Sequence, residues 1–224
     1  MNFLGRNIKA AIFDLDGTLI DSTEVWDRVD AQFFAARNMD IPEDYSKKIA
    51  HIGLDEAAIF TKETYGIKES IEEILDEWYR LSKKQYEEEI ELKPYTIELL
   101  EYLKKNGVKL SIATANTKDL YIPCLKRLKI YDYFDVIVDV DETKVGKNDA
   151  ALYNTTIARL NVKSEETVVF EDIPIGLKTA YNNNYLTIAV YDKHSISETY
   201  NKKKYSHLFI DNFMEFIDYA KREN

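Results

Sequence analysis

The stretch AAIFDLDGTLIDS, residues 10–22, places two carboxylates directly after a short apolar run. Ala10 to Phe13 have the composition of a buried strand, and Asp14 and Asp16 follow where this strand would end. Two acids this close repel each other, and burial of an unpartnered charge is costly. The sequence therefore predicts that a positive charge, or a proton carried by one of the acids, lies at this position.

The composition is that of an acidic globular protein. Of the 224 residues, 45% are apolar, which is enough for a core, and the net charge is −10 with a pI of about 4.9. This charge predicts no binding to nucleic acid or to anionic membranes. The single cysteine, Cys124, excludes an internal disulfide and fits a reducing compartment. Because no signal-peptide core and no run of ~20 apolar residues is present, we expect a cytoplasmic protein. We also expect a monomer.

Short β-rich runs alternate with helical patterns along most of the chain. The predicted strands cover residues 8–13, 108–114, 134–139, 167–172 and 185–190, and helical patterns between them cover 97–107, 120–130 and 150–160. Alternation of this kind is typical of βαβ units. It predicts an α/β fold with a parallel sheet and helices on both faces.

One interval breaks this alternation. The residues between the first two strands show no strand pattern and form amphipathic helical patterns over 24–38, 43–50, 55–65 and 70–90. We therefore expect an inserted all-helical domain. In this division residues 1–22 and 92–224 form the α/β core, and residues 23–91 form the insertion.

Polar residues follow several of the predicted strands. Ligands of open α/β sheets bind at the carboxyl ends of the strands, so these side chains are expected to meet there. Besides Asp14 and Asp16, the candidates are Thr114, Ala115 and Asn116 after the second core strand, Lys147 before a helix, and Glu171 and Asp172 after the fourth strand.

Four short motifs identify a family resemblance. DLDGT (14–18), IAT (112–114), VGK (145–147) and FEDIPIG (170–176) resemble, in this order, the motifs of the haloacid dehalogenase-like superfamily of phosphatases and phosphomutases. The resemblance covers nearly the whole chain, and the insertion is similar to the helical cap of phosphoglycolate phosphatases and β-phosphoglucomutases. It implies a Rossmann-like core with a helical cap. It also implies a Mg²⁺-dependent phosphohydrolase that acts on a small phosphorylated metabolite through an aspartyl-phosphate.

The resemblance assigns chemistry to the acidic residues. Asp14 would be the nucleophile, and Asp16 would act first as general acid and then as general base. The Mg²⁺ ligands would be Asp14, the backbone carbonyl of Asp16, and Asp172. Glu171 would complete the metal site, as a ligand or by orienting a coordinating water. These roles explain the paired acids, because one is neutralised by the ion and the other carries a proton.

The resemblance also assigns phosphate contacts. Lys147 would bridge the nucleophile and the phosphate, although Asn148 and Asp149 follow it where the family usually has prolines. The hydroxyl of Thr114 and the backbone N–H of Ala115 would hold phosphate oxygens, and Asn116 would bind substrate beside them.

Two residues of the insertion are candidates for substrate contact. His51 lies in the turn AHIGLDEAA, and the family often places substrate-selecting residues in such a turn. Trp26 faces either the core of the cap or the site. By its spacing it stands where β-phosphoglucomutases carry a histidine that assists mutase chemistry, which disfavours a mutase.

Three functions are consistent with this sequence. The first is a phosphatase, the second a sugar-phosphate mutase with the same core, and the third a non-catalytic phospholigand-binding protein. The third is disfavoured because every motif keeps its functional residue. A true haloacid dehalogenase is disfavoured because that chemistry normally lacks the second acid of the first motif, and Asp16 is present.

Overall fold

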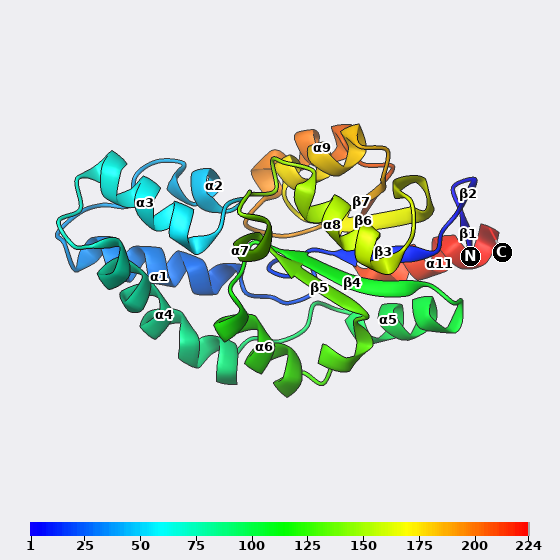
Figure 1. The fold of residues 1–224 in the computed structure, drawn as a ribbon, viewed down its shortest axis with the longest axis horizontal. Coiled ribbons are helices and arrows are strands. Elements are labelled where there is room, and N and C mark those ends of the chain that lie inside the picture. The colour runs from blue at the N-terminus through cyan, green and yellow to red at the C-terminus, as the bar shows by residue number, and fades with distance from the viewer. Residues whose placement is uncertain (224) are drawn as a thin grey trace.

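The apolar runs of the sequence form the centre of a six-stranded parallel sheet with the order β5-β4-β3-β6-β7-β8. The computed structural model describes residues 1–223. Figure 1 shows the sheet between two layers of helices. The strands are β3 (Ala10–Phe13), β4 (Lys109–Thr114), β5 (Val136–Asp139), β6 (Thr167–Glu171), β7 (Leu186–Val190) and β8 (Leu208–Ile210).

Helices cover both faces of this sheet, which is why its central strands are apolar at successive positions. Ile12 faces α8 (Ala151–Leu160) and α9 (Pro174–Asn182), in one cluster with Leu152 and Ala180. Its neighbours Ala11 and Phe13 belong to the cluster on the opposite face. That face packs on α5 (Thr96–Lys105), α6 (Lys118–Arg127) and α11 (Phe213–Glu223).

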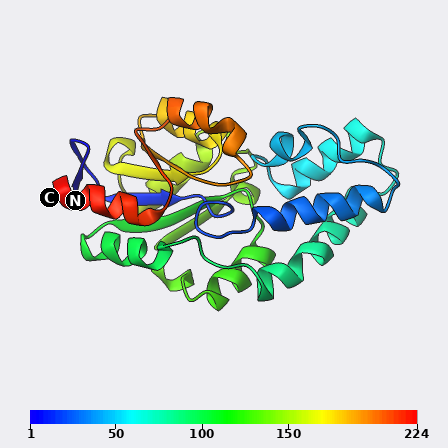
Figure 2. The same cartoon turned by 180° about the vertical axis from the view of Figure 1, so that it is seen from behind.

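The predicted helical insertion is present between β3 and α5. It contains α1 (Thr23–Ala35), α2 (Tyr45–Ile49), α3 (Leu54–Tyr65) and α4 (Ile71–Glu88). Figures 1 and 2 place these helices at one end of the sheet, opposite the end where both termini lie. An aromatic core holds them together, with Phe33 against Trp78 at 5.4 Å between ring centroids and Phe34 against Tyr45 at 4.9 Å.

The fold-class prediction is confirmed, and several short elements add to it. The sixth strand β8 was not predicted, because three residues are too few for a recognisable pattern. Other short elements are β1 (Asn2–Phe3) and β2 (Arg6–Asn7), which pair as a hairpin, α7 (Val140–Thr143) and α10 (Thr199–Lys204). Within residues 1–223, every helix is too short or too polar to cross a membrane.

Candidate active site

The carboxyl ends of β3 and β6 bring the predicted acids together. Phe13 pairs with Phe170 in the parallel register, so the residues that follow each strand emerge side by side. The backbone N–H of Asp14 continues this ladder by donating to the carbonyl of Phe170 at 2.9 Å. Asp14, Glu171 and Asp172 each offer one oxygen within 4.8 Å of the others, and all three residues are buried.

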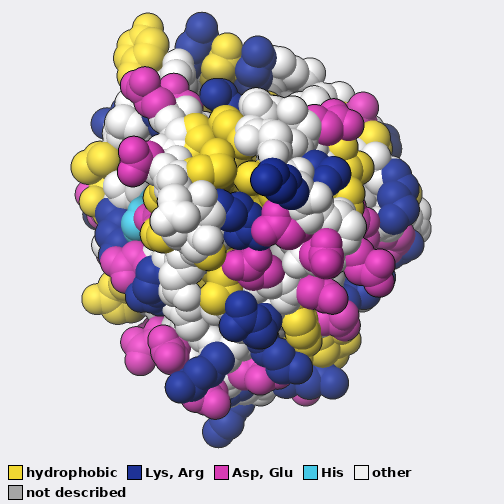
Figure 3. Space-filling model, turned by 90° about the vertical axis from the view of Figure 1, so that its left-hand side faces the viewer, with side chains coloured by type: hydrophobic (Ala, Val, Ile, Leu, Met, Phe, Trp, Pro, Cys, Tyr) yellow, Lys and Arg dark blue, Asp and Glu magenta, His cyan; other side chains and the backbone are white. Residues whose placement is uncertain are grey.

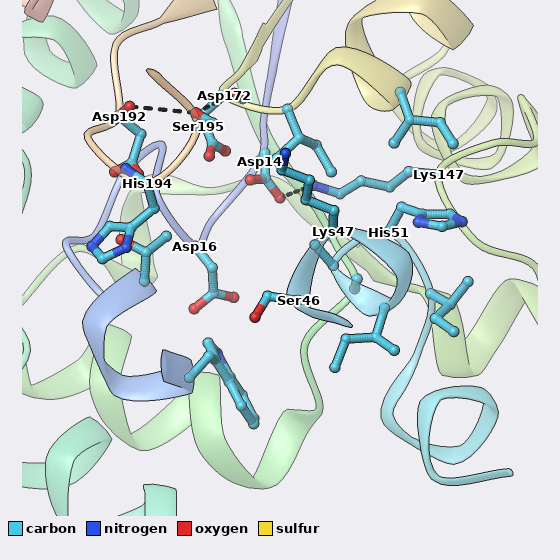
Figure 4. A pocket seen from close by; sticks show the side chains of 18 of the residues that line it. Asp14, Asp16, Ser46, Lys47, His51, Lys147, Asp172, Asp192, His194 and Ser195 are labelled. Atoms are coloured by element: carbon cyan, nitrogen blue, oxygen red, sulfur yellow. Dashed lines mark hydrogen bonds and ion pairs between the residues drawn. The ribbon is translucent and has the colours of Figure 1, made fainter. Parts of the chain in front are cut away.

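Lys147 provides the positive charge that the sequence requires. Its ammonium forms ion pairs with Asp14 and, at 3.0 Å, with Oε2 of Glu171. Burial alone would lower the pKa of Lys147, but the surrounding carboxylates, Asp14 first, raise this pKa above its ordinary value. Figure 4 shows the Lys147 side chain extending to the Asp14 carboxylate across the floor of the pocket.

The acidic cluster has the composition of a divalent-cation site. When all three carboxyl groups are ionised, the single ammonium of Lys147 does not balance their charge. Burial raises the pKa of Glu171 to about 7 and raises the pKa of Asp172 well above its ordinary value, with the charge of Asp14 adding to both shifts. A cation with carboxylate ligands would offset these charges, and hard oxygen donors are the ligands that Mg²⁺ prefers.

Gly17 and Thr18 shape the turn that leaves the first motif. Gly17 has a φ of +80°, and a Cβ on it would lie 2.6 Å from Oδ2 of Asp172, so a side chain here would enter the acidic cluster. The hydroxyl of Thr18 donates to Oδ1 of Asp172 at 3.0 Å. Sequence reasoning did not assign Thr18 a role, although the residue stands in the quoted motif.

A pocket of about 410 Å³ lies between this edge of the sheet and the helical insertion. It brings together most of the predicted site residues: Asp14, Asp16, Trp26, His51, Ala115, Asn116, Lys147 and Asp172 all line it. Glu171 and Thr114 are fully buried and are not among its lining residues. The Thr114 hydroxyl accepts the backbone N–H of Asn116 at 3.0 Å, so it shapes the loop that carries Asn116.

The side chain of Asp16 points away from the acidic cluster. In Figure 4, Asp14 points toward Lys147, whereas Asp16 points toward the insertion near Ser46. The Asp16 carboxylate accepts hydrogen bonds from the hydroxyl of Ser22 at 2.6 Å, from the amide of Asn116 at 2.9 Å and from the hydroxyl of Tyr86. Burial raises the pKa of Asp16, and these hydrogen bonds oppose the shift.

The insertion contributes the far wall of the pocket. The backbone carbonyl of His51 accepts the backbone N–H of Lys147 at 2.8 Å, so this turn contacts the core beside the site. Burial lowers the pKa of the half-buried His51 imidazole, which favours its neutral form. The Trp26 indole lines the pocket and donates to the hydroxyl of Tyr86 at 2.9 Å.

Sequence reasoning missed two further polar groups in this wall. The hydroxyl of Ser46 donates to Oδ2 of Asp30 at 3.0 Å, and both residues line the pocket. Burial raises the pKa of Asp30 to about 7. The sequence does carry a sign of Asp30, because it is an acidic residue on the otherwise apolar, buried face of α1.

The outer surface of the insertion in Figure 3 carries Lys, Arg, Asp and Glu side chains intermingled.

Comparison with known proteins agrees with the geometry of the site. The sequence profile described as "Haloacid dehalogenase-like hydrolase" matches residues 11–190. The chain belongs to the haloacid dehalogenase-like hydrolase family. The resemblance carried by the four motifs is therefore confirmed.

Several curated relatives of this chain have phosphatase or pyrophosphatase names. A "Phosphorylated carbohydrates phosphatase" of Thermotoga maritima is 31% identical over 173 residues, covering 77% of this chain and 80% of the relative. "Protein CbbY" of Rhodobacter capsulatus is 30% identical over 184 residues, covering 77% and 81%. "Pyrophosphatase PpaX" of Bacillus cereus is 27% identical over 186 residues, covering 82% and 83%.

Solved structures match the fold of this chain over nearly its whole length. CbbY from Rhodobacter sphaeroides, in complex with phosphate, matches with a TM-score of 0.77 at 24% identity, over 92% of this chain and 95% of that one. The β-phosphoglucomutase of Clostridium difficile matches with a TM-score of 0.80 at 22% identity, over 96% and 98%. At these identities the likeness establishes the fold.

Proposed function

We propose that this phosphatase of the haloacid dehalogenase-like superfamily hydrolyses a small phosphorylated metabolite through an aspartyl-phosphate on Asp14. The observation that carries the proposal is the buried Asp14 carboxylate, which is ion-paired with Lys147 at the floor of a pocket large enough for a small metabolite. Phosphatase names among the curated relatives support it.

The proposed reaction has two steps. In the first, an Asp14 oxygen attacks phosphorus, the ester P–O bond breaks, and the leaving oxygen takes a proton from Asp16. In the second, Asp16 takes a proton from water while the water oxygen attacks phosphorus. The bond between phosphorus and the Asp14 oxygen breaks, which releases phosphate and restores the Asp14 carboxylate. Lys147 offsets the negative charge that accumulates between Asp14 and the phosphoryl oxygens. Ala115 and Asn116 line the pocket and would bind the substrate there, with Thr114 holding their loop in place.

A divalent cation fits beside Asp14, and we propose Mg²⁺. Asp14, Asp172 and the backbone carbonyl of Asp16 would hold it, and Glu171 would support the site through the shared acidic cluster. When bound, the ion would supply Lewis-acid stabilisation of the phosphoryl oxygens.

Removal of the cation is expected to abolish turnover. The protein after exhaustive chelation should release no phosphate above background, and Mg²⁺ should restore release. Ca²⁺ should inhibit, because its larger coordination number can draw both Asp14 oxygens onto the metal. Thermal unfolding gives a second readout, since Mg²⁺ should raise the melting temperature of the native protein. Full turnover by the chelated protein would contradict the proposal.

We propose that residues 23–91 act as a cap over the core formed by residues 1–22 and 92–224. The two connections between these parts run side by side, with the Asp21 N–H donating to the Glu91 carbonyl at 2.9 Å and the Lys93 N–H to the Leu19 carbonyl at 2.9 Å. Such paired connections can serve as a hinge. Closure of the cap would exclude bulk water from the site.

Substitution of the cap residues in the pocket is expected to change substrate preference. His51→Ala and Trp26→Ala should each alter the relative kcat/KM among a panel of phosphorylated metabolites, by roughly 10–200-fold for lost packing. Activation by Mg²⁺ should stay unchanged, because neither residue belongs to the acidic cluster. His207→Ala is the matched control, since His207 is not among the residues that line the pocket. An unchanged order of substrates in both variants would show that these side chains only pack the cap.

The mutase alternative differs only in the final acceptor, which would be a sugar hydroxyl instead of water. By its spacing from the first motif, Trp26 stands where the family resemblance implies a histidine in β-phosphoglucomutases, and it donates its only N–H to Tyr86. This arrangement favours hydrolysis. The same substrate panel distinguishes the two reactions, because a mutase would convert a sugar monophosphate into its isomer without net phosphate release.

A further inference from the structure

We propose that Tyr86, in the last turn of cap helix α4, is a positioning residue that holds the Asp16 carboxyl group for proton transfer. The inference rests on the proposed function, in which Asp16 exchanges protons with the leaving oxygen and with water. Tyr86 is fully buried, although its hydroxyl reaches a residue of the first motif 70 positions earlier.

The direction of each hydrogen bond around Tyr86 is fixed by its partners. The Oδ1 of Asn116 accepts the backbone N–H of Thr117 at 2.7 Å, so its Nδ2 is the group that faces Tyr86 and Asp16. This Nδ2 donates to the Tyr86 hydroxyl oxygen at 2.9 Å, and the Trp26 indole, which can only donate, does the same at 2.9 Å. With two donors on its oxygen, the Tyr86 hydroxyl directs its own proton to Oδ1 of Asp16.

The Asp16 carboxyl group is thereby held from three parts of the chain. Ser22 is the last core residue before the insertion, Tyr86 lies near the end of the insertion, and Asn116 follows β4 in the core. Three donors on two oxygens fix the plane of the carboxyl group as well as its position. Removal of the Tyr86 hydroxyl would also leave the Trp26 indole N–H and one Asn116 amide proton without this acceptor.

This position suits proton exchange with the leaving group. In an in-line displacement the leaving oxygen lies opposite the attacking Asp14 oxygen. Asp14 points toward Lys147 at the core side of the pocket, so the leaving group extends toward the cap. Asp16 lies on that side, and Tyr86 holds it there.

The test uses the dependence of the rate on the leaving group. An alkoxide leaving group needs a proton as it departs, whereas 4-nitrophenolate does not. Tyr86→Phe should therefore reduce kcat/KM for the best alkyl phosphate of the panel by about 10–100-fold, a part of the 10²–10⁴-fold typical of general acid catalysis. For 4-nitrophenyl phosphate the reduction should stay within about 3-fold, and activation by Mg²⁺ should not change.

Tyr45→Phe is the matched control, because Tyr45 is another buried cap tyrosine and its hydroxyl contacts Thr61 within the cap at 2.8 Å. It should leave the ratio of the two kcat/KM values unchanged. Uniform loss on both substrates in Tyr86→Phe, or no loss, would overturn the inference and leave Tyr86 with a packing role.

Asp16→Asn separates failure of this inference from failure of the proposed function. This variant should show the same selective loss, to a larger extent. If it does not, the proposed role of Asp16 is wrong, and the inference about Tyr86 falls with it. In the double variant Asp16→Asn/Tyr86→Phe, the Tyr86 substitution should cause no further selective loss, because it acts through Asp16. Additive losses would mean that Tyr86 acts independently, which would contradict the inference.

Discussion

Asp14→Asn is expected to reduce kcat/KM on the order of 10⁴–10⁶-fold, the range typical for loss of a catalytic nucleophile. The amide has nearly the shape of the carboxylate but is a poor nucleophile toward phosphorus. It also removes the ion pair with Lys147 and one oxygen ligand from the acidic cluster. Steady-state phosphate release over the metabolite panel measures the effect.

Asp119→Asn is the control for this variant, because Asp119 is exposed in the first turn of α6. It should retain full activity. A residual activity of the Asp14→Asn protein within tenfold of the native enzyme, with the same melting temperature, would exclude Asp14 as the nucleophile.

Lys147→Met should destabilise the fold as well as remove activity. Lys147 is almost fully buried between Asp14 and Glu171, and its loss leaves buried carboxylates without their cation. Breaking a buried ion pair in this way typically costs about 3–5 kcal/mol, or roughly 6–20 °C in melting temperature for a chain of this size. Thermal unfolding in the absence of divalent cations measures the loss. Lys118→Met, which removes an exposed ammonium near Asp139, should change the melting temperature far less.

The pH dependence of the Lys147→Met protein gives a second readout. The pKa of Glu171 is already raised to about 7 by burial and by Asp14, and loss of the Lys147 cation raises it further. When a carboxyl group has a higher pKa in the folded state than in the unfolded state, the free energy of unfolding falls as the pH rises between these two pKa values. The deficit relative to the native protein should therefore be larger at pH 8 than at pH 5. A deficit that is independent of pH would show that lost packing, and not unpaired charge, causes the destabilisation.

The core of the site can be predicted from the sequence, because residues that follow adjacent parallel strands lie close together in this fold. The carboxyl ends of adjacent parallel strands meet at one edge, so Asp14 after β3 and Asp172 after β6 come together once the strands are recognised. Lys147 is harder to place, since it follows no strand directly. Only its motif connects it with Asp14, and the structure brings its ammonium to that carboxylate.

The contacts of Asp16 could not be predicted from the sequence. Tyr86 belongs to the apolar stripe of α4, and nothing in that pattern distinguishes its hydroxyl from those of other packed tyrosines. Its contact with Asp16 depends on how the end of α4 lies beside the loop that carries Asn116. Likewise, nothing in the sequence indicates that the Thr114 hydroxyl accepts the Asn116 backbone N–H, and the predicted contact of this hydroxyl with phosphate stays a prediction.

Detection of the phosphorylated enzyme tests the central claim most directly. The native protein, mixed with its best substrate and Mg²⁺ and quenched in acid within milliseconds, should carry one phosphoryl group. Peptide mass spectrometry should locate this group on Asp14, and hydroxylamine should remove it, as expected for an acyl phosphate. With 4-nitrophenyl phosphate, whose leaving group needs no proton, the Asp16→Asn protein should accumulate more of this species, because only the second step lacks its general base. Phosphate release without any phosphorylated peptide in either protein, or with the group on another residue, would contradict the account.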